Sequence, residues 1–124
     1  MFDGGPCVKE VKKNLLFICS RNQWRSPTAE QIFSRSPGLQ ARSRGLSASA
    51  VRRLTQSDVA WADVIFVMES KHKQQLLKRF REDVADRPVH VLDIPDEFQF
   101  MDPELVELIE SGVRGALDSP DDDV

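Results

Sequence analysis

The sequence predicts an α/β fold in which helices flank a doubly wound, four-stranded parallel sheet. The main observation is that two kinds of segment alternate along the chain. Short apolar runs, typical of strands buried on both faces, are separated by longer segments with a helical apolar stripe. The second is size, since 124 residues, 40% of them hydrophobic, suit one compact core. We expect a single domain over residues 14–117, with a loose segment at 1–13 and a disordered acidic tail at 118–124.

The first strand is predicted over residues 14–19, because positions 15–18 form an unbroken apolar run. The next element is a helix over residues 27–35. Ser26 is a residue type that caps helix N-termini, and Pro27 is tolerated in a first helical turn. The domain therefore begins with a strand, a loop and a helix.

The remaining elements continue the alternation. We predict a short strand at 41–45, a helical turn opened by Thr55, a strand at 63–68, a helix at 71–82, a strand at 89–92 and a final helix at 103–117. The expected strand order is 2-1-3-4, as in flavodoxin-like folds. In such sheets ligands bind beyond the carboxyl ends of the strands at the topological switch point, which here is the loop after the first strand.

That loop, from Cys19 to Ser26, has the residue types needed to hold and attack a phosphate group. The free N–H groups and the positive dipole end of the following helix favour an anion. The same field favours the thiolate form of Cys19, which is then a nucleophile without a separate base. Arg25 supplies a planar fork of donors that matches two phosphate oxygens, and Ser26 is placed to hydrogen-bond the thiolate.

The residues between the thiol and the arginine are expected to curl around the phosphate oxygens as an anion nest of backbone N–H groups. Such a nest needs a residue that accepts unusual dihedral angles. Asn22 suits this position, because asparagine visits the left-handed region more readily than most non-glycine residues. The predicted phosphate-binding residues are Ser20, Arg21, Asn22, Gln23, Trp24, Arg25 and Ser26.

These motifs resemble the signature of the low-molecular-weight protein tyrosine phosphatases. The matching segments are 15–19, Asn22, 25–30, 43–45, 54–58 and 62–69, within a stretch from about 14 to 110. The resemblance implies an enzyme without metal or cofactor that hydrolyses phosphomonoesters, protein phosphotyrosine first among them. It implies that Cys19 attacks phosphorus to form a phosphocysteine, that an aspartic acid protonates the leaving oxygen, and that water then releases phosphate.

The resemblance also places the acid in a loop after the last strand, where three aspartates compete. Asp96 is favoured, because the strand end and the following Ile-Pro pair align with the family's pattern, although Glu97 stands where proline usually follows. Asp102 is the runner-up, since Asp102-Pro103 is the literal Asp-Pro dipeptide. The same pair also describes an ordinary helix start with Asp102 as the cap. Asp93 is the third candidate.

The chain departs from the family at several positions of the site. Trp24 replaces a second loop cysteine, so a protective disulfide with the nucleophile is not expected. The only other cysteine, Cys7, is either incidental or a resolving thiol. The chain has no tyrosine, and the expected substrate rim is Trp24, Phe98 and Phe100, unless both phenylalanines pack the loop onto the sheet. Residues 46–52 form a shorter connection than in relatives.

The pocket rim is expected to be more basic and polar than in relatives, because Arg21 and Gln23 replace small and apolar residues. Other basic residues near the site either steer an anionic substrate or form a solvated face. They are Arg42, Arg44, Arg52 and Arg53. The Lys-His-Lys run at 71–73 is predicted on the solvent side of its helix.

Other functions suit the same loop. Phosphoarginine and small phosphoesters are alternative substrates. The alternative classes of function are an arsenate reductase-like enzyme using an external thiol, a phosphocysteine carrier, and a module that binds phosphorylated partners.

The net charge of −3 indicates no obligatory nucleic acid, and no apolar run is long enough for a membrane span or a signal peptide. We expect a cytoplasmic protein that acts on a phosphorylated protein or small phosphoester; the sequence does not predict its oligomeric state.

Overall fold

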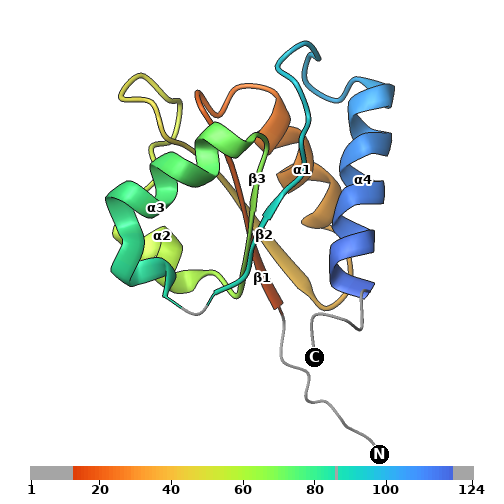
Figure 1. Ribbon diagram of the computed structural model, residues 1–124. Helices are drawn as coiled ribbons and strands as arrows, with labels where there is room; N and C mark the ends of the chain where they lie inside the picture. The colour runs from red at the N-terminus through yellow and green to blue at the C-terminus, as the bar shows by residue number, and fades with distance from the viewer. Residues whose placement is uncertain (1–12, 86, 119–124) are drawn as a thin grey trace, which may run out of the picture.

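The computed structural model describes residues 13–85 and 87–118 (Figure 1). Four parallel strands form one sheet in the order β2-β1-β3-β4, so the predicted order 2-1-3-4 is confirmed. The strands are β1 (Lys13–Cys19), β2 (Leu39–Gly45), β3 (Val64–Val67) and β4 (Val89–Val91). The predictions for Cys7, for the segment before residue 13 and for the tail after residue 118 lie outside the described residues.

Helices cover both faces of the sheet, as Figure 1 shows. On one face lie α1 (Arg25–Phe33) and α4 (Pro103–Asp118), and on the other lie α2 (Gln56–Trp61) and α3 (Ser70–Val84). This is the doubly wound arrangement that the alternating pattern predicted. None of these described helices combines the length and the apolar character that crossing a membrane requires.

The inner strand β1 contributes to two hydrophobic cores. Leu15 and Phe17 belong to the core beneath α1 and α4, whereas Leu16 and Ile18 belong to the core beneath α2 and α3. All four side chains are fully buried, which explains the unbroken apolar run. Burying each such side chain stabilises the fold by about 1.5–3 kcal/mol, so β1 gives the loop that follows it a rigid base.

The structure corrects the predicted start of the first helix. Helix α1 begins at Arg25 rather than at residue 27, and Trp24 occupies the N-cap position without a side-chain hydrogen bond. Ser26 therefore does not cap the helix. It is buried in the first turn, where its hydroxyl contacts Cys19. Pro27 is tolerated there because the N–H groups of a first turn have no intrahelical partner.

The segments that follow β1, β2 and β4 meet at the carboxyl end of the sheet (Figure 1). Gly45, the last residue of β2, is paired with Cys19 in the register of the two strands. A Cβ atom on Gly45 would lie 2.5 Å from the Cβ of Ala50 and 2.7 Å from the carbonyl oxygen of Ser20. Only glycine lets the chain after β2 approach the loop after β1 this closely.

Candidate active site

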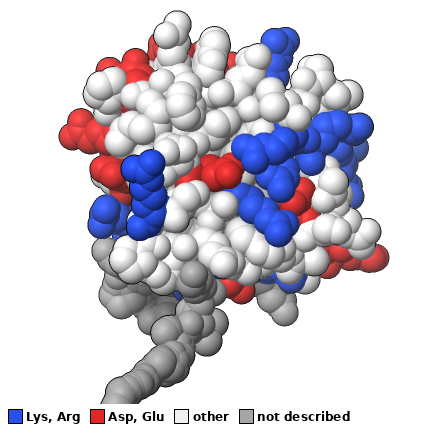
Figure 2. Space-filling model, turned by 180° about the vertical axis from the view of Figure 1, so that it is seen from behind, with Lys and Arg blue, Asp and Glu red and all other residues white. Residues whose placement is uncertain are grey.

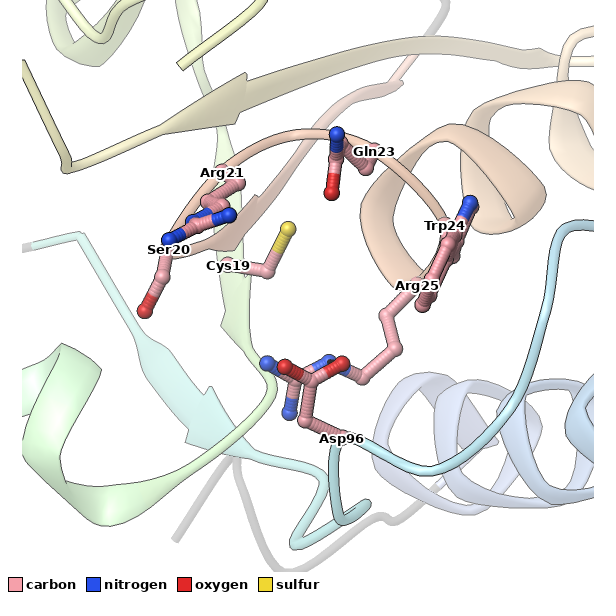
Figure 3. Close-up of a pocket in the computed structure, with 7 residues that line it drawn as sticks. All are labelled: Cys19, Ser20, Arg21, Gln23, Trp24, Arg25 and Asp96. Atoms are coloured by element: carbon pink, nitrogen blue, oxygen red, sulfur yellow. Dashed lines mark ion pairs between the residues drawn. The ribbon is translucent and has the colours of Figure 1, made fainter. Parts of the chain in front are cut away.

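Cys19 ends β1, and the chain turns back over its side chain (Figure 3). The Sγ atom accepts the N–H of Asn22 at 3.2 Å and lies 3.0 Å from the Oγ of Ser26. This tight turn needs a left-handed residue, and Asn22 has a φ of 58°, as predicted. The sulfur is therefore held inside the loop between two polar groups.

The hydroxyl of Ser26 is oriented by a second hydrogen bond. The side-chain Nδ2 of Asn22 donates to Ser26 Oγ at 3.0 Å. Because this bond uses the oxygen as an acceptor, the hydroxyl hydrogen is free to be donated to the sulfur of Cys19. Two donors therefore face the sulfur that would act as the nucleophile.

The short connection after β2 pairs with the outer side of the loop. Three backbone N–H groups from residues 46–51 donate to the carbonyls of Cys19, Ser20 and Arg21 at 2.8–3.0 Å. A trans peptide directs its N–H opposite to its C=O. The N–H groups of residues 20–22 therefore point to the inner side, where the sulfur lies, as an anion nest requires.

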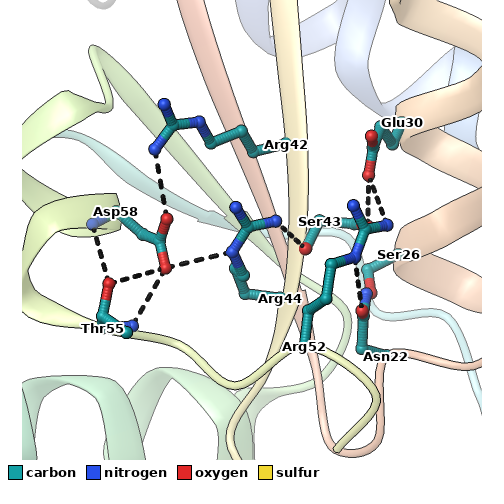
Figure 4. A network of polar contacts seen from close by, with 9 residues as sticks. All are labelled: Asn22, Ser26, Glu30, Arg42, Ser43, Arg44, Arg52, Thr55 and Asp58. Atoms are coloured by element: carbon teal, nitrogen blue, oxygen red, sulfur yellow. Dashed lines mark hydrogen bonds and ion pairs between the residues drawn. The ribbon is translucent and has the colours of Figure 1, made fainter.

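Arg52 supports the loop from behind (Figure 4). Its Nε lies 3.4 Å from Oδ1 of Asn22, and its Nη2 donates to Glu30 at 3.0 Å and to Ser43 at 3.1 Å. The hydroxyl of Ser43 also donates to Glu30. The sequence predicted Arg52 only as one of several basic residues near the site. In the structure, it belongs to the network that holds Asn22, the left-handed residue of the loop.

Arg25 closes the loop, with its side chain only 3% exposed. Its Nη1 donates to Oε2 of Glu69 at 2.5 Å and to the carbonyl of Ile94 at 2.8 Å. Its Nε lies 3.7 Å from Oδ1 of Asp96. Because Nη1 is anchored twice, the planar group has a fixed orientation, and its Nε and Nη2 edge can bind two oxygens of a phosphate.

Glu69, just after β3, is a site residue that the sequence pattern did not single out. Partial burial raises the pKa of its carboxyl, but the hydrogen bond and charge of Arg25, with the charge of Lys71, outweigh this effect. The net pKa of Glu69 is therefore lowered. Glu69 is a carboxylate at neutral pH and fixes the orientation of Arg25.

His72 corrects the prediction that residues 71–73 lie on the solvent side of their helix, because it is fully buried. Its Nδ1 accepts the N–H of Glu69 at 3.1 Å, so the proton of the neutral ring is on Nε2. That nitrogen lies 3.0 Å from the Oγ of Ser20 and donates to it. The first turn of α3 thus holds both ends of the loop, Ser20 through His72 and Arg25 through Glu69.

Burial also explains the charge state of His72. It lowers the pKa of the ring to about 4, and the positive charge of Arg25 acts in the same direction while Glu69 opposes it. The ring is neutral at physiological pH. One sequence signal was available: His72 precedes the buried Leu76 by four residues, a spacing that places both on one helical face.

The three candidate acids occupy different places. Asp96 lines the same pocket as Cys19 and is 63% exposed. Asp102 caps α4 instead, where its Oδ1 accepts the N–H of Glu104 at 2.9 Å. Asp93 lines a neighbouring depression, of which Asp96 also forms part. Of the three, only Asp96 lines the pocket that contains the thiol.

The pocket has a volume of about 260 Å³. Its lining residues are Cys19, Ser20, Arg21, Gln23, Trp24, Arg25 and Asp96 (Figure 3). All seven are among the predicted site residues. Trp24 stands on the α1 side of the opening and Arg21 on the opposite side. Asn22 and Ser26 lie beneath, in contact with the sulfur.

The two phenylalanines of the expected rim do not line this pocket. Phe98 is half-buried and packs against the core beneath α1 and α4. Phe100 is 48% exposed, outside the pocket lining. Phe98 therefore packs against the core, as the alternative prediction stated, whereas Phe100 is an exposed side chain that does not line the pocket.

Arginines behind the pocket are largely engaged in ion pairs. Arg42 and Arg44 lie 3.2 and 3.1 Å from the buried carboxylate of Asp58, and Arg42 also stacks on the ring of Trp61 (Figure 4). Figure 2 shows Lys and Arg gathered at one side of the rear face, the side on which α2 and α3 lie.

Among the described residues, no cluster of three or more His, Cys, Asp or Glu side chains is arranged to hold a metal ion.

No protein-family model and no curated protein matches the sequence. Solved structures do match. One is the YwlE arginine phosphatase from Geobacillus stearothermophilus, with a TM-score of 0.67 and 24% identity over 85% of this chain and 92% of that one. Another is the tyrosine phosphatase Wzb from Escherichia coli K30 in complex with phosphate, with a TM-score of 0.68 and 20% identity over 84% and 95% of the two chains. A third is a low-molecular-weight protein tyrosine phosphatase from T. tengcongensis, with a TM-score of 0.63 and 22% identity over 82% and 92%.

The fold and the loop define a class of protein, namely a doubly wound α/β protein with a cysteine–arginine loop at the carboxyl end of its first strand. Within that class, the fold is that of the low-molecular-weight protein tyrosine phosphatases. The resemblance seen in the sequence is thus confirmed at the level of the fold.

Proposed function

We propose that this protein is a cysteine-dependent phosphatase that hydrolyses phosphomonoesters, with protein phosphotyrosine as the first expected substrate. One observation carries the proposal: the residues predicted as nucleophile, phosphate ligand and acid, which are Cys19, Arg25 and Asp96, line one pocket. Similarity in fold to tyrosine and arginine phosphatases supports the same class of reaction.

In the first step the phosphoryl group moves to sulfur. The Cys19 thiolate attacks phosphorus, the bond from phosphorus to the leaving oxygen breaks, and protonated Asp96 gives its proton to that oxygen. The products are a phosphocysteine, the free alcohol and the Asp96 carboxylate. A variant of YwlE arginine phosphatase with serine in place of cysteine has a phosphorylated active-site serine, which supports a covalent intermediate in this fold.

In the second step water releases phosphate. The Asp96 carboxylate takes a proton from a water molecule as the water oxygen attacks phosphorus, and the bond from phosphorus to sulfur breaks. The thiolate of Cys19 returns to the donors on Asn22 and Ser26, which stabilise it as a leaving group. Both steps spread negative charge over the equatorial oxygens, where Arg25 and the nest of N–H groups can stabilise it.

The substrate range follows from the rim. Trp24 offers one aromatic wall for the ring of a phosphotyrosine, while Gln23 and Arg21 make the remaining wall polar. Phosphoarginine and small phosphoesters are therefore the alternatives to compare directly. We further propose that the protein works in the cytoplasm, because its chemistry needs Cys19 as a free thiol.

The test is phosphate release from an aryl phosphate in the presence of a metal chelator, with wild type, Cys19→Ser and Asp96→Asn. Asp93→Asn is the matched control, because Asp93 belongs to the same segment but lines a different depression. We expect wild-type turnover, no turnover by Cys19→Ser, and near-normal turnover by Asp93→Asn. A wild-type protein that releases no phosphate would contradict the proposal.

The same assay separates the other classes. A stable phosphoprotein without free phosphate would indicate a carrier, and tight binding of the aryl phosphate without either product would indicate a binding module. Conversion of arsenate to arsenite with added glutathione would indicate a reductase that uses an external thiol, since Cys19 is the one cysteine among the described residues.

A further inference from the structure

Three exposed apolar side chains belong to the pocket wall and to the segment that is hydrogen-bonded behind it. Trp24 is 41% exposed, Phe100 48% and Met101 39%, and together they are three of the five large hydrophobic side chains that the described residues expose. Exposed apolar surface near a binding site marks a place where a ligand or partner is contacted. We call these three residues the apolar ridge.

Hydrogen bonds join the two parts of the ridge. The N–H of Met101 donates to the Oγ1 of Thr28 at 2.9 Å, and the same hydroxyl donates to the carbonyl of Trp24 at 2.6 Å. The side chain of Thr28 is fully buried, and both bonds are partly buried. Met101 and Trp24, which lie 77 positions apart in the sequence, are thereby linked through Thr28 by two hydrogen bonds.

The backbone at Met101 is held in an unfavourable conformation. Its φ is 63°, in the left-handed region that is unfavourable for a non-glycine residue. The bond to Thr28 and the bond from the N–H of Asp102 to the carbonyl of Gln99 keep the turn in place. Strain of this kind persists where the surroundings fix it, and it is concentrated at ligand clamps and functional sites. Here it accompanies the exposure of Met101.

The ridge and the pocket share one residue. Trp24 belongs to both, since it lines the pocket and forms the near end of the ridge. Across the opening stands Arg21, which is charged and exposed (Figure 3). A phosphorylated side chain that reaches Cys19 would therefore place its neighbours in the chain between an apolar flank and a basic one.

We infer that the apolar ridge is a recognition surface for a phosphorylated polypeptide that carries an apolar residue beside its phosphorylated residue. This inference rests on the proposed function. A polypeptide is the occupant because Trp24 lines the phosphate pocket whereas Phe100 and Met101 do not, so a small phosphoester bound in the pocket would leave those two side chains uncovered. An apolar neighbour would remove Phe100 and Met101 from water.

The experiment compares three phosphotyrosine peptides that differ only next to the phosphotyrosine, with Leu before it, Leu after it, or Ser at both positions. For the wild type we expect one Leu peptide to have a kcat/KM about five- to tenfold above the Ser peptide, mainly through KM. In Phe100→Ser/Met101→Asn, where asparagine tolerates the left-handed backbone, this ratio should fall to about one. Leu108→Ser, which removes another exposed apolar side chain, should keep the wild-type ratio.

The outcomes separate the ridge from the phosphatase. If the wild type releases phosphate from an aryl phosphate but shows no preference among the peptides, or if the ridge variant keeps the preference, the ridge inference is overturned and the proposed function stands. If the wild type releases no phosphate, the proposed function fails. In that case the ridge inference is tested by binding, with fluorescence anisotropy of the same peptides carrying a fluorescent label. Tighter binding of one Leu peptide than of the Ser peptide to the wild type supports the inference, and equal binding overturns it.

Discussion

The inner side of the loop from Cys19 to Ser26 and the rim of the pocket differ in how completely their polar groups are fixed. On the inner side, Asn22 and Ser26 are buried and hydrogen-bonded to the sulfur of Cys19 and to each other. At the rim, Trp24 is 41% exposed and the Asp96 side chain 63% exposed.

For the proposed phosphatase, this difference separates chemistry from selectivity. In the proposed reaction the inner side would contact only the atoms that every phosphate ester shares, whereas the rim would contact the leaving group. A substitution on the inner side should therefore slow the reaction of all substrates, and a substitution on the rim should change their ranking. The predictions below test that division, beginning with the largest effect.

Arg25→Lys should have the largest effect. It keeps the charge but loses the planar fork that Glu69 and Ile94 orient, so kcat should fall about 10³-fold on every substrate. Arg21→Lys on the rim is the matched control and should change kcat less than about threefold. Steady-state kinetics with an aryl phosphate and a phosphopeptide measure both. If kcat fell equally in the two variants, the proposed distinction between the inner side and the rim would be wrong.

Asp96→Asn should have the second-largest effect. With a poor leaving group such as phenyl phosphate, loss of the acid should lower kcat about 10²-fold, and the loss should shrink with p-nitrophenyl phosphate, whose leaving oxygen needs less protonation. Asp102→Asn should retain activity, because asparagine caps a helix as well as aspartate does. Greater damage from Asp102→Asn than from Asp96→Asn would transfer the role of the acid to Asp102.

His72 should make stability depend on pH. The folded ring has a pKa of about 4 against 6.5 for the free side chain. Between these values the unfolded chain binds a proton that the folded chain does not, so the free energy of unfolding should decrease as pH falls from 6.5 toward 4. The decrease attributable to His72 should reach about 2–3 kcal/mol, and the contribution is fully present above pH 6.5.

Urea unfolding of wild type and His72→Asn at pH 7, 5.5 and 4.5 measures this effect. Asparagine offers a short acceptor for the N–H of Glu69 but does not titrate, so the difference between the two proteins isolates the histidine from the carboxylates. The prediction fails if both proteins lose stability equally over this range.

Arg52→Gln should give the smallest effect. Its contacts to Asn22 and Glu30 lie behind the loop and are half-exposed, so we expect a loss of about 1 kcal/mol in the free energy of unfolding and a few-fold decrease in kcat. Arg53→Gln, one position away and exposed, is the control and should change neither quantity. Identical results for the neighbouring arginines would show that the contact to Asn22 does not matter.

Local sequence patterns were sufficient for the elements and for the inner side of the loop. The apolar run of β1, the cap at Thr55 and the left-handed Asn22 each depend on residues within a few positions. Glu69 and His72 were missed because their partners, Arg25 and Ser20, lie 44 and 52 positions away. No periodicity encodes a contact that arises only when separate strands end at the same edge of a sheet.

The start of α1 shows a second limit. Ser26 has the residue type of a helix cap, and its hydroxyl could satisfy either the helix backbone or the nucleophile. Within the folded loop it serves Cys19, and the helix begins one residue before it, at Arg25. Residue type alone could not decide between these two partners, because both are hydrogen-bonding groups within reach of the same side chain.

The ion pair between Arg25 and Glu69 has a consequence for the last step of the proposed reaction. An isolated buried guanidinium would hold inorganic phosphate, the product of that reaction, as firmly as it holds the reacting group. Glu69 already occupies Nη1 and offsets part of the positive charge, so free phosphate meets only the remaining donors. Binding that is equally strong in every state does not speed turnover. We therefore expect weak product inhibition, with departure of phosphate made easier by the carboxylate that orients the arginine.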